Sequence, residues 1–178
     1  MNKIRIITFF VFLLIFTGIF QLGSMSTVSQ EEADLFMEEF EKLVLDIDAF
    51  GIFVHNTTIA LPMFIPGFGI FWGLFSSWST GYAFAAIITS MPEIGHISPL
   101  SILFLSPFGL MEISAYSLAI SRSFILIKAI ITKTNLSQFI KPTIIEIGIV
   151  IVLLLAGGYI EFYMIELVEN ESIEMPGL

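Results

Sequence analysis

The chain has 178 residues, enough for one domain, and 56% of them are hydrophobic. Charged residues make up only 13% of the chain, whereas a soluble domain usually carries about 25%. The apolar residues form long blocks such as Ile6–Phe20 and Ile147–Ala156, and helical blocks of about 20 apolar residues match the thickness of a bilayer core. We therefore expect an all-α integral membrane protein that forms a single domain.

Several kinds of chemistry are disfavoured by residues that the chain lacks. There is no cysteine, which excludes disulfides, thiolate metal sites and cysteine nucleophiles. The formal net charge is -9 and the seven Lys and Arg residues form no patch, whereas nucleic-acid binding needs clustered basic residues. The two histidines, His55 and His96, lie in separate segments, and the sequence shows no triad spacing, phosphate loop or HExxH pattern. We expect no enzymatic activity, no cofactor, no metal site and no nucleic-acid partner.

Residues 1–23 begin with Lys3 and Arg5 and continue as an apolar run to Phe20. This pattern is typical of either a signal peptide or a first membrane span. The apolar run is long, and Leu22-Gly23-Ser24 is a poor cleavage site, so we predict an uncleaved first helix.

Residues 29–48 have a different pattern, that of an acidic amphipathic helix. Ser29-Gln30-Glu31-Glu32 predicts a capping box at its start. Apolar residues then recur at helical spacing with glutamates between them. We expect this helix either to lie at the membrane surface against the next helices or to be an ordinary solvated connection.

Residues 50–165 predict four further spans, which gives about five in all. The expected spans are Phe50–Phe64, Ile70–Ile88, a long segment Leu100–Ile131, and a last helix from Pro142 to about Ile165. Ser106-Pro107-Phe108-Gly109 is expected to break the long segment, because proline removes a helical hydrogen bond. Pro142 suits the first turn of the last helix, and residues 166–178 form an acidic tail.

The distribution of basic residues predicts the orientation. Lys3 and Arg5 place the N-terminus in the cytoplasm, and Lys133 and Lys141 place the loop before the last span on the same side. Five spans satisfy both assignments, so the C-terminus and the acidic helix 29–48 are expected outside the plasma membrane.

Small residues recur every four positions along the third predicted span. Such a row lets another helix approach closely, which is the main source of helix association in a bilayer. We expect its partner to be the small-residue stripe of segment Leu100–Ile131, or a second protein. The row consists of Gly69, Gly73, Ser77, Gly81 and Ala85.

Glu112 and Arg122 are ionisable residues inside an apolar segment, where such residues are costly and are usually paired or functional. Glu112 is expected either to cap the helix that restarts after Pro107 or to form an ion or proton site. Arg122 is expected to extend toward the inner surface or to pair with Glu146. His55 and Asn56 belong to the most polar cluster at membrane depth, where hydrogen bonding between helices is the common role.

Two short motifs resemble one known family. Pro107-Phe108-Gly109-Leu110-Met111-Glu112, followed by Ile113-Ser114-Ala115, is similar to the Pro-His-Gly-x-x-Glu-Leu-Pro-Ala signature of the stage II sporulation protein M family. Phe53-Val54-His55-Asn56 is similar to that family's Phe-x-Asn-Asn. Phe108 replaces the family histidine and His55 replaces the first asparagine. An acidic helix before the second span and about five spans also fit this family.

The resemblance implies a non-enzymatic scaffold or accessory subunit of a membrane protein complex. The family's namesake belongs to a membrane complex that supports engulfment of the forespore, but relatives occur in organisms that never sporulate. The expected partners are the lipid bilayer and either other membrane proteins or further copies of the chain. The alternative is a small transporter or exporter component with an ion or proton site at Glu112.

Overall fold

The computed structural model describes residues 3–45 and 47–174. The elements in chain order are α1 (Lys3–Ser24), α2 (Gln30–Val44), α3 (Ala49–Ala60), the 3-10 turn η1 (Leu61–Phe64), α4 (Phe68–Ser90), the 3-10 turn η2 (Pro92–Ile94), α5 (Pro99–Leu105), α6 (Pro107–Ile131) and α7 (Ser137–Glu174). The described part of the chain is all-helical, as predicted.

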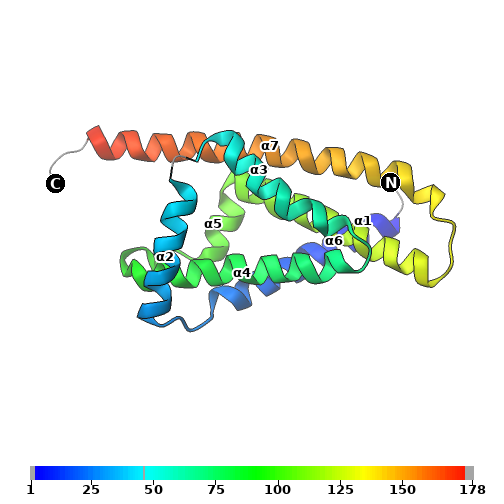
Figure 1. Cartoon of the computed structure of the whole chain (residues 1–178), viewed down its shortest axis with the longest axis horizontal. Coiled ribbons are helices and arrows are strands. Elements are labelled where there is room, and N and C mark those ends of the chain that lie inside the picture. The colour runs from blue at the N-terminus through cyan, green and yellow to red at the C-terminus, as the bar shows by residue number, and fades with distance from the viewer. Residues whose placement is uncertain (1–2, 46, 175–178) are drawn as a thin grey trace.

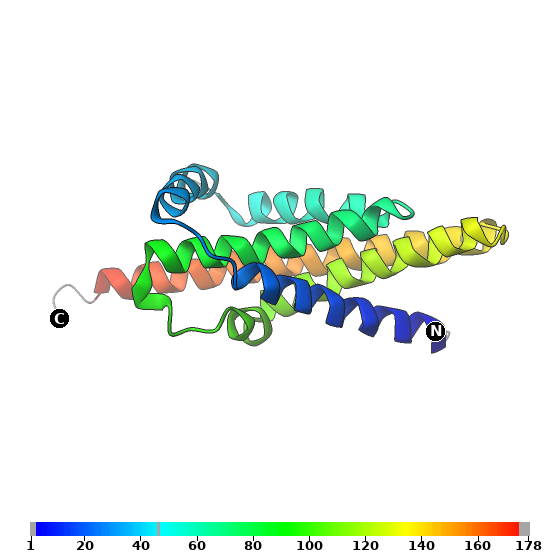
Figure 2. The same cartoon turned by 90° about the horizontal axis from the view of Figure 1, so that it is seen from below.

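The long helices run along the long axis of the molecule, whereas α2 and α5 cross it (Figure 1). Figure 2 shows α1 and α3 on opposite sides of the other long helices. Helix α1 packs on α4 and α6, and α3 packs on α7. The acidic α2 lies near one end of this bundle, and the connection between α6 and α7 forms the other end (Figure 1).

Three helices in the described part of the chain are long and apolar enough to cross a membrane, not the predicted five. They are α1, α6 and residues Ser137–Leu167 of α7. Helix α3 has 12 residues and is therefore about 18 Å long, shorter than the bilayer core of about 30 Å. Helix α4 has 23 residues, but the glycine, serine and threonine residues between its apolar side chains lower its mean hydropathy.

Local signals determine two helix starts as predicted. The Ser29 hydroxyl accepts from the Glu32 backbone N–H and the Glu32 carboxylate accepts from the Ser29 backbone N–H, which completes a capping box. The Ser29 backbone N–H first, and then the Ser29 hydroxyl, donate to the Glu32 carboxylate and lower the pKa of Glu32. The long segment is broken between Leu105 and Pro107, where Ser106 accepts from the Gly109 backbone N–H and caps α6.

The last helix differs from its prediction at both ends. It starts at Ser137, so Pro142 lies inside the helix and Lys141 lies on it, not in a loop. The Asn135 side chain accepts from the Ser137 backbone N–H and stabilises this earlier start. At the other end α7 continues to Glu174, so most of the residues expected to form an acidic tail are helical.

The core lies where α1, α4 and α6 meet and is built mainly from large apolar side chains. Phe20, Met63 and Ile120 are fully buried. Aromatic pairs such as Phe16 with Tyr116, whose ring centroids are 5.8 Å apart, connect α1 to α6. This packing fixes α1 and α6, two of the helices that carry the buried polar residues described below.

Candidate functional site: two buried polar clusters

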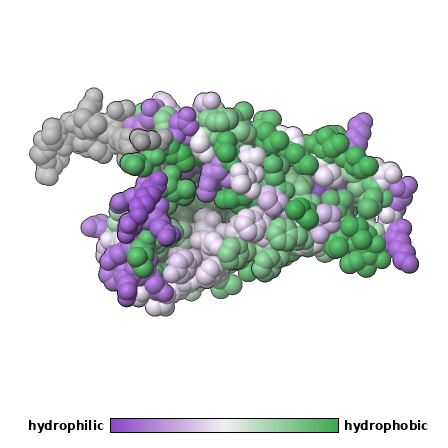
Figure 3. Space-filling view, viewed as in Figure 1, coloured by the Kyte–Doolittle hydropathy of each residue, from purple (hydrophilic) through white to green (hydrophobic). Residues whose placement is uncertain are grey.

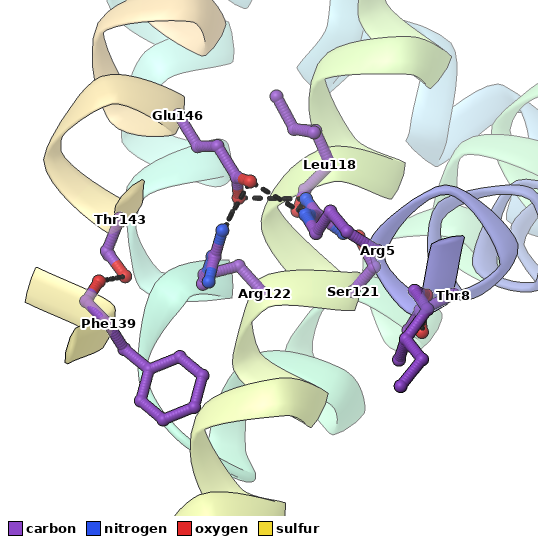
Figure 4. Close-up of polar contacts among 9 residues, drawn as sticks. Arg5, Thr8, Leu118, Ser121, Arg122, Phe139, Thr143 and Glu146 are labelled. Carbon is purple, nitrogen blue, oxygen red and sulfur yellow. Dashed lines mark hydrogen bonds and ion pairs between the residues drawn. The ribbon is translucent and has the colours of Figure 1, made fainter. Parts of the chain in front are cut away.

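The first cluster consists of Glu146 of α7 between two arginines, Arg5 of α1 and Arg122 of α6 (Figure 4). The Arg5 Nε and Nη2 atoms donate to the two Glu146 carboxylate oxygens at 2.7 and 2.8 Å. Arg122 Nε donates to Glu146 Oε2 at 2.8 Å and its Nη2 donates to Oε1. Both guanidinium groups therefore bind the carboxylate in the bidentate arrangement, which is the strong form of this pair.

Two further hydrogen bonds occupy other donors of Arg5. Its Nη1 donates to Ser121 Oγ at 2.7 Å and its Nη2 donates to the Leu118 carbonyl at 3.0 Å. All three charged residues are buried, with Arg122 only 4% exposed. The cluster thus joins α1, α6 and α7, the three helices that are able to span a membrane among the residues that the structure describes.

The sequence indicated only part of this cluster. Pairing of Arg122 with Glu146 was one of two expectations, and the structure shows this pair and no extension of Arg122 toward the surface. Arg5 was expected only to mark the cytoplasmic side, yet it is buried beside Glu146. The available signal was Glu146 itself, because a carboxylate in the apolar run Ile144-Ile145-Glu146-Ile147 requires partners.

The second cluster lies between α3, α6 and α7 and contains Glu112. The Asn56 Nδ2 atom donates to Glu112 Oε1 at 2.5 Å. Glu161 of α7 lies within electrostatic range of Glu112. Within the described part of the chain, Glu161 Oε2 and Thr57 Oγ1 are buried without a hydrogen-bond partner. This cluster is therefore acidic and incompletely paired, in contrast to the saturated carboxylate of Glu146.

The cap of α6 is Ser106, not Glu112. The Ser106 hydroxyl accepts from the Gly109 backbone N–H at 3.1 Å. Pro107 occupies the first turn of α6, where its missing N–H has no cost. A side chain at Gly109 would lie 2.6 Å from the Leu103 carbonyl oxygen, so glycine permits the tight approach of α5 to α6. Glu112 is thereby left free to bind Asn56.

His55 and Asn56 are adjacent in sequence but point in different directions. Asn56 is 8% exposed and faces Glu112, whereas His55 is exposed. His96, in the connection after η2, is also exposed.

The small-residue row of α4 is buried and packs mainly on segments of the same chain. Ser77 donates to the Phe16 carbonyl of α1 at 2.7 Å. A side chain at Gly81 would collide with the backbone of α1 at Phe20 and Ser24. The row was expected to meet α6 or a second protein: Gly73 does pack on Ile120 of α6, whereas Ser77 and Gly81 meet α1, which was not predicted. The buried members are Gly69, Gly73, Ser77, Gly81 and Ala85.

The two motifs that resemble one family meet in space, because Asn56 of the first donates to Glu112 of the second. The family model for stage II sporulation protein M matches residues 6–164. The chain belongs to this family. No curated protein and no solved structure matches the chain. The match covers nearly all of the three helices that, among the described residues, are able to span a membrane, and it includes both polar clusters except Arg5.

Proposed function

We propose that this stage II sporulation protein M relative is a non-enzymatic scaffold or accessory subunit of a protein complex in the plasma membrane. The N-terminus lies in the cytoplasm and the C-terminus outside. Partner chains, or further copies of this chain, bind the end of the molecule that carries α2 and the last turns of α7. The support for this proposal comes from the two helices, α7 and α2, that this end of the molecule carries beyond the membrane.

The observation that carries the proposal is the length of α7. Its 38 residues make a helix of about 57 Å, whereas a bilayer core is about 30 Å thick. The helix projects beyond the other elements at the end opposite the α6–α7 connection (Figure 1). When a helix extends several turns beyond the bilayer, a partner helix or domain can pack against its side.

Helix α2 lies across the bundle near the same end and contributes a second surface (Figure 1). Ala33 is fully buried against α4, together with Val28. Leu35 and Leu43 remain 59% and 56% exposed on the same helix. The glutamates of α2 are exposed, so this end combines apolar side chains with a negative field, which favours a partner with a complementary basic surface.

The test is affinity purification of the full chain from native membranes, with copurifying proteins quantified by mass spectrometry. The variant Glu31→Lys/Glu39→Lys reverses two exposed charges on α2. Glu93→Lys reverses one exposed charge in η2 and is the control for a charge reversal outside α2. We expect a defined set of proteins with the wild type and with Glu93→Lys, and loss of that set with the α2 variant. Retention of the set by the α2 variant would place the partner elsewhere and contradict the proposed surface.

The second cluster favours one alternative function, a small transporter or exporter component with an ion or proton site at Glu112. Two acidic residues, Glu112 and Glu161, lie near each other inside the helix bundle, and such residues commonly mark ion or proton paths. The test is proton or cation flux in proteoliposomes of the purified chain. Flux that depends on pH and is lost in Glu112→Gln would favour the transporter over the scaffold.

A further inference from the structure

The basic residues gather at the end of the molecule where α6 connects to α7. From Ile113 to Ile145 the sequence contains Arg122, Lys128, Lys133 and Lys141 but no aspartate or glutamate. The start of α1, with Lys3 and Arg5, lies at the same end (Figure 1). Of the seven basic residues, all but Lys42 of α2 are therefore in this region.

Charge at this end is far from balanced within the described chain. Glu146 is the acidic residue here, and it already binds both arginines. Lys3, Lys128, Lys133 and Lys141 are exposed. This end of the molecule therefore has a strongly positive electrostatic potential. A ligand at the membrane surface that is complementary to this potential is an anion.

An apolar groove of about 310 Å³ lies at the same end of the molecule, next to the α6–α7 connection. Its walls come from α6, from α7 and from the turn before α4, and Leu136 of the α6–α7 connection also lines it. Two of the lining residues, Ile140 and Ile144, are 58% and 63% exposed, so the groove opens outward. Hydrophilic side chains at this end of the molecule border hydrophobic ones (Figure 3).

Two of the basic residues are close in sequence to residues that line the groove. Lys141 follows Ile140, a wall of the groove, and Lys133 lies three residues before Leu136. A neutral lipid would fill the groove but leave the lysines without counter-charge. A free anion would bind the lysines but leave the groove uncovered, and only an anionic lipid satisfies both features.

We propose that this basic end binds an anionic phospholipid of the cytoplasmic leaflet, with the phosphate against the lysines and an acyl chain in the groove between α6 and α7. Basic pockets between membrane helices on the cytoplasmic side are a recognised way to hold anionic headgroups. The bound lipid covers the open side of the α6–α7 hairpin next to the Arg122–Glu146 pair.

The test is a titration of the delipidated full chain, in neutral detergent, with phosphatidylglycerol or with phosphatidylcholine of the same acyl chains. Bound lipid is counted by native mass spectrometry. The wild type should bind phosphatidylglycerol more tightly than phosphatidylcholine. Lys133→Gln/Lys141→Gln should weaken phosphatidylglycerol binding by about 30-fold, since each lysine near a membrane surface contributes about fivefold. Lys42→Gln, at the other end, should leave it unchanged.

A second pair of variants tests the groove separately. Ile144→Ser should weaken binding of phosphatidylglycerol, whereas Val152→Ser, equally exposed two turns along α7, should not. Glycerol phosphate, which has the anionic group without acyl chains, should not compete with the lipid at equal concentration. Equal binding of the two lipids, an unchanged affinity in the lysine variant, or effective competition by glycerol phosphate would each overturn the proposal. All the variants change exposed side chains, and size-exclusion chromatography checks that they are folded.

Discussion

Replacement of Gly81 by alanine tests the packing of α4 on α1 directly. The new Cβ would lie 2.8 Å from the Ser24 backbone nitrogen and closer still to the Phe20 carbonyl oxygen. Ordinary contact begins at 3.4 Å, so the helices must separate by at least 0.6 Å (3.4 minus 2.8). The obstacle on α1 is backbone, which cannot rotate away as a side chain can. Separation also lengthens the 2.7 Å hydrogen bond from Ser77 to the Phe16 carbonyl.

We therefore expect Gly81→Ala to lower the free energy of unfolding by about 1–3 kcal/mol, the usual cost of forcing extra volume into a packed interface. Gly18→Ala on α1 is the matched control, because a Cβ there meets nothing within 4 Å. Alanine is the better helix former, so Gly18→Ala should stabilise the chain by about 0.5–1 kcal/mol. Thermal unfolding in detergent micelles measures both. If Gly81→Ala is as stable as Gly18→Ala, the close α1–α4 contact is wrong.

Other substitutions test the polar residues. Glu146→Gln should lower the free energy of unfolding by about 3–5 kcal/mol, because it leaves two buried arginines without a counter-charge; chemical unfolding in micelles measures it, and a loss below 1 kcal/mol would contradict the cluster. Glu112→Gln should unfold at a higher temperature than Glu112→Leu, since the amide can still accept from Asn56; equal melting temperatures would argue against a structural role. The lowered pKa of Glu32 means that its cap stabilises α2 above the pKa of the unfolded carboxyl and that this stabilisation is lost as the pH falls through the folded pKa. Hydrogen-exchange protection of the Ser29 amide should follow that pH dependence in the wild type and be pH-independent in Glu32→Gln.

Signals confined to a few residues predicted the elements well. The capping box at Ser29 and the break at Pro107 depend on hydrogen bonds within a single turn, so they are visible in the sequence. Pro142 misled the prediction because its position suits a first turn, yet Asn135 caps the helix earlier. The number of spans was overestimated because apolar length was counted without allowing for the short α3 and the small, weakly apolar residues of α4.

The polar clusters depend on long-range contacts that no local pattern contains. Arg5 and Glu146 are 141 residues apart, and Asn56 and Glu112 are 56 apart. The four-residue spacing on α4 correctly indicated a packing face, but the spacing says nothing about which helix covers it. An unpaired carboxylate in an apolar run shows that a partner must exist, and only the fold shows which residue it is.

Under the proposed function, the chain is a subunit of a larger membrane assembly. The most direct test is to extract it from native membranes into polymer nanodiscs without detergent and to measure the polypeptide mass in each disc. A single chain has a mass of 19.9 kDa. We predict discs that contain this chain together with further polypeptide in a fixed ratio, whether other proteins or additional copies. Discs that hold one chain alone, at native expression and with the bilayer intact, would contradict the claim.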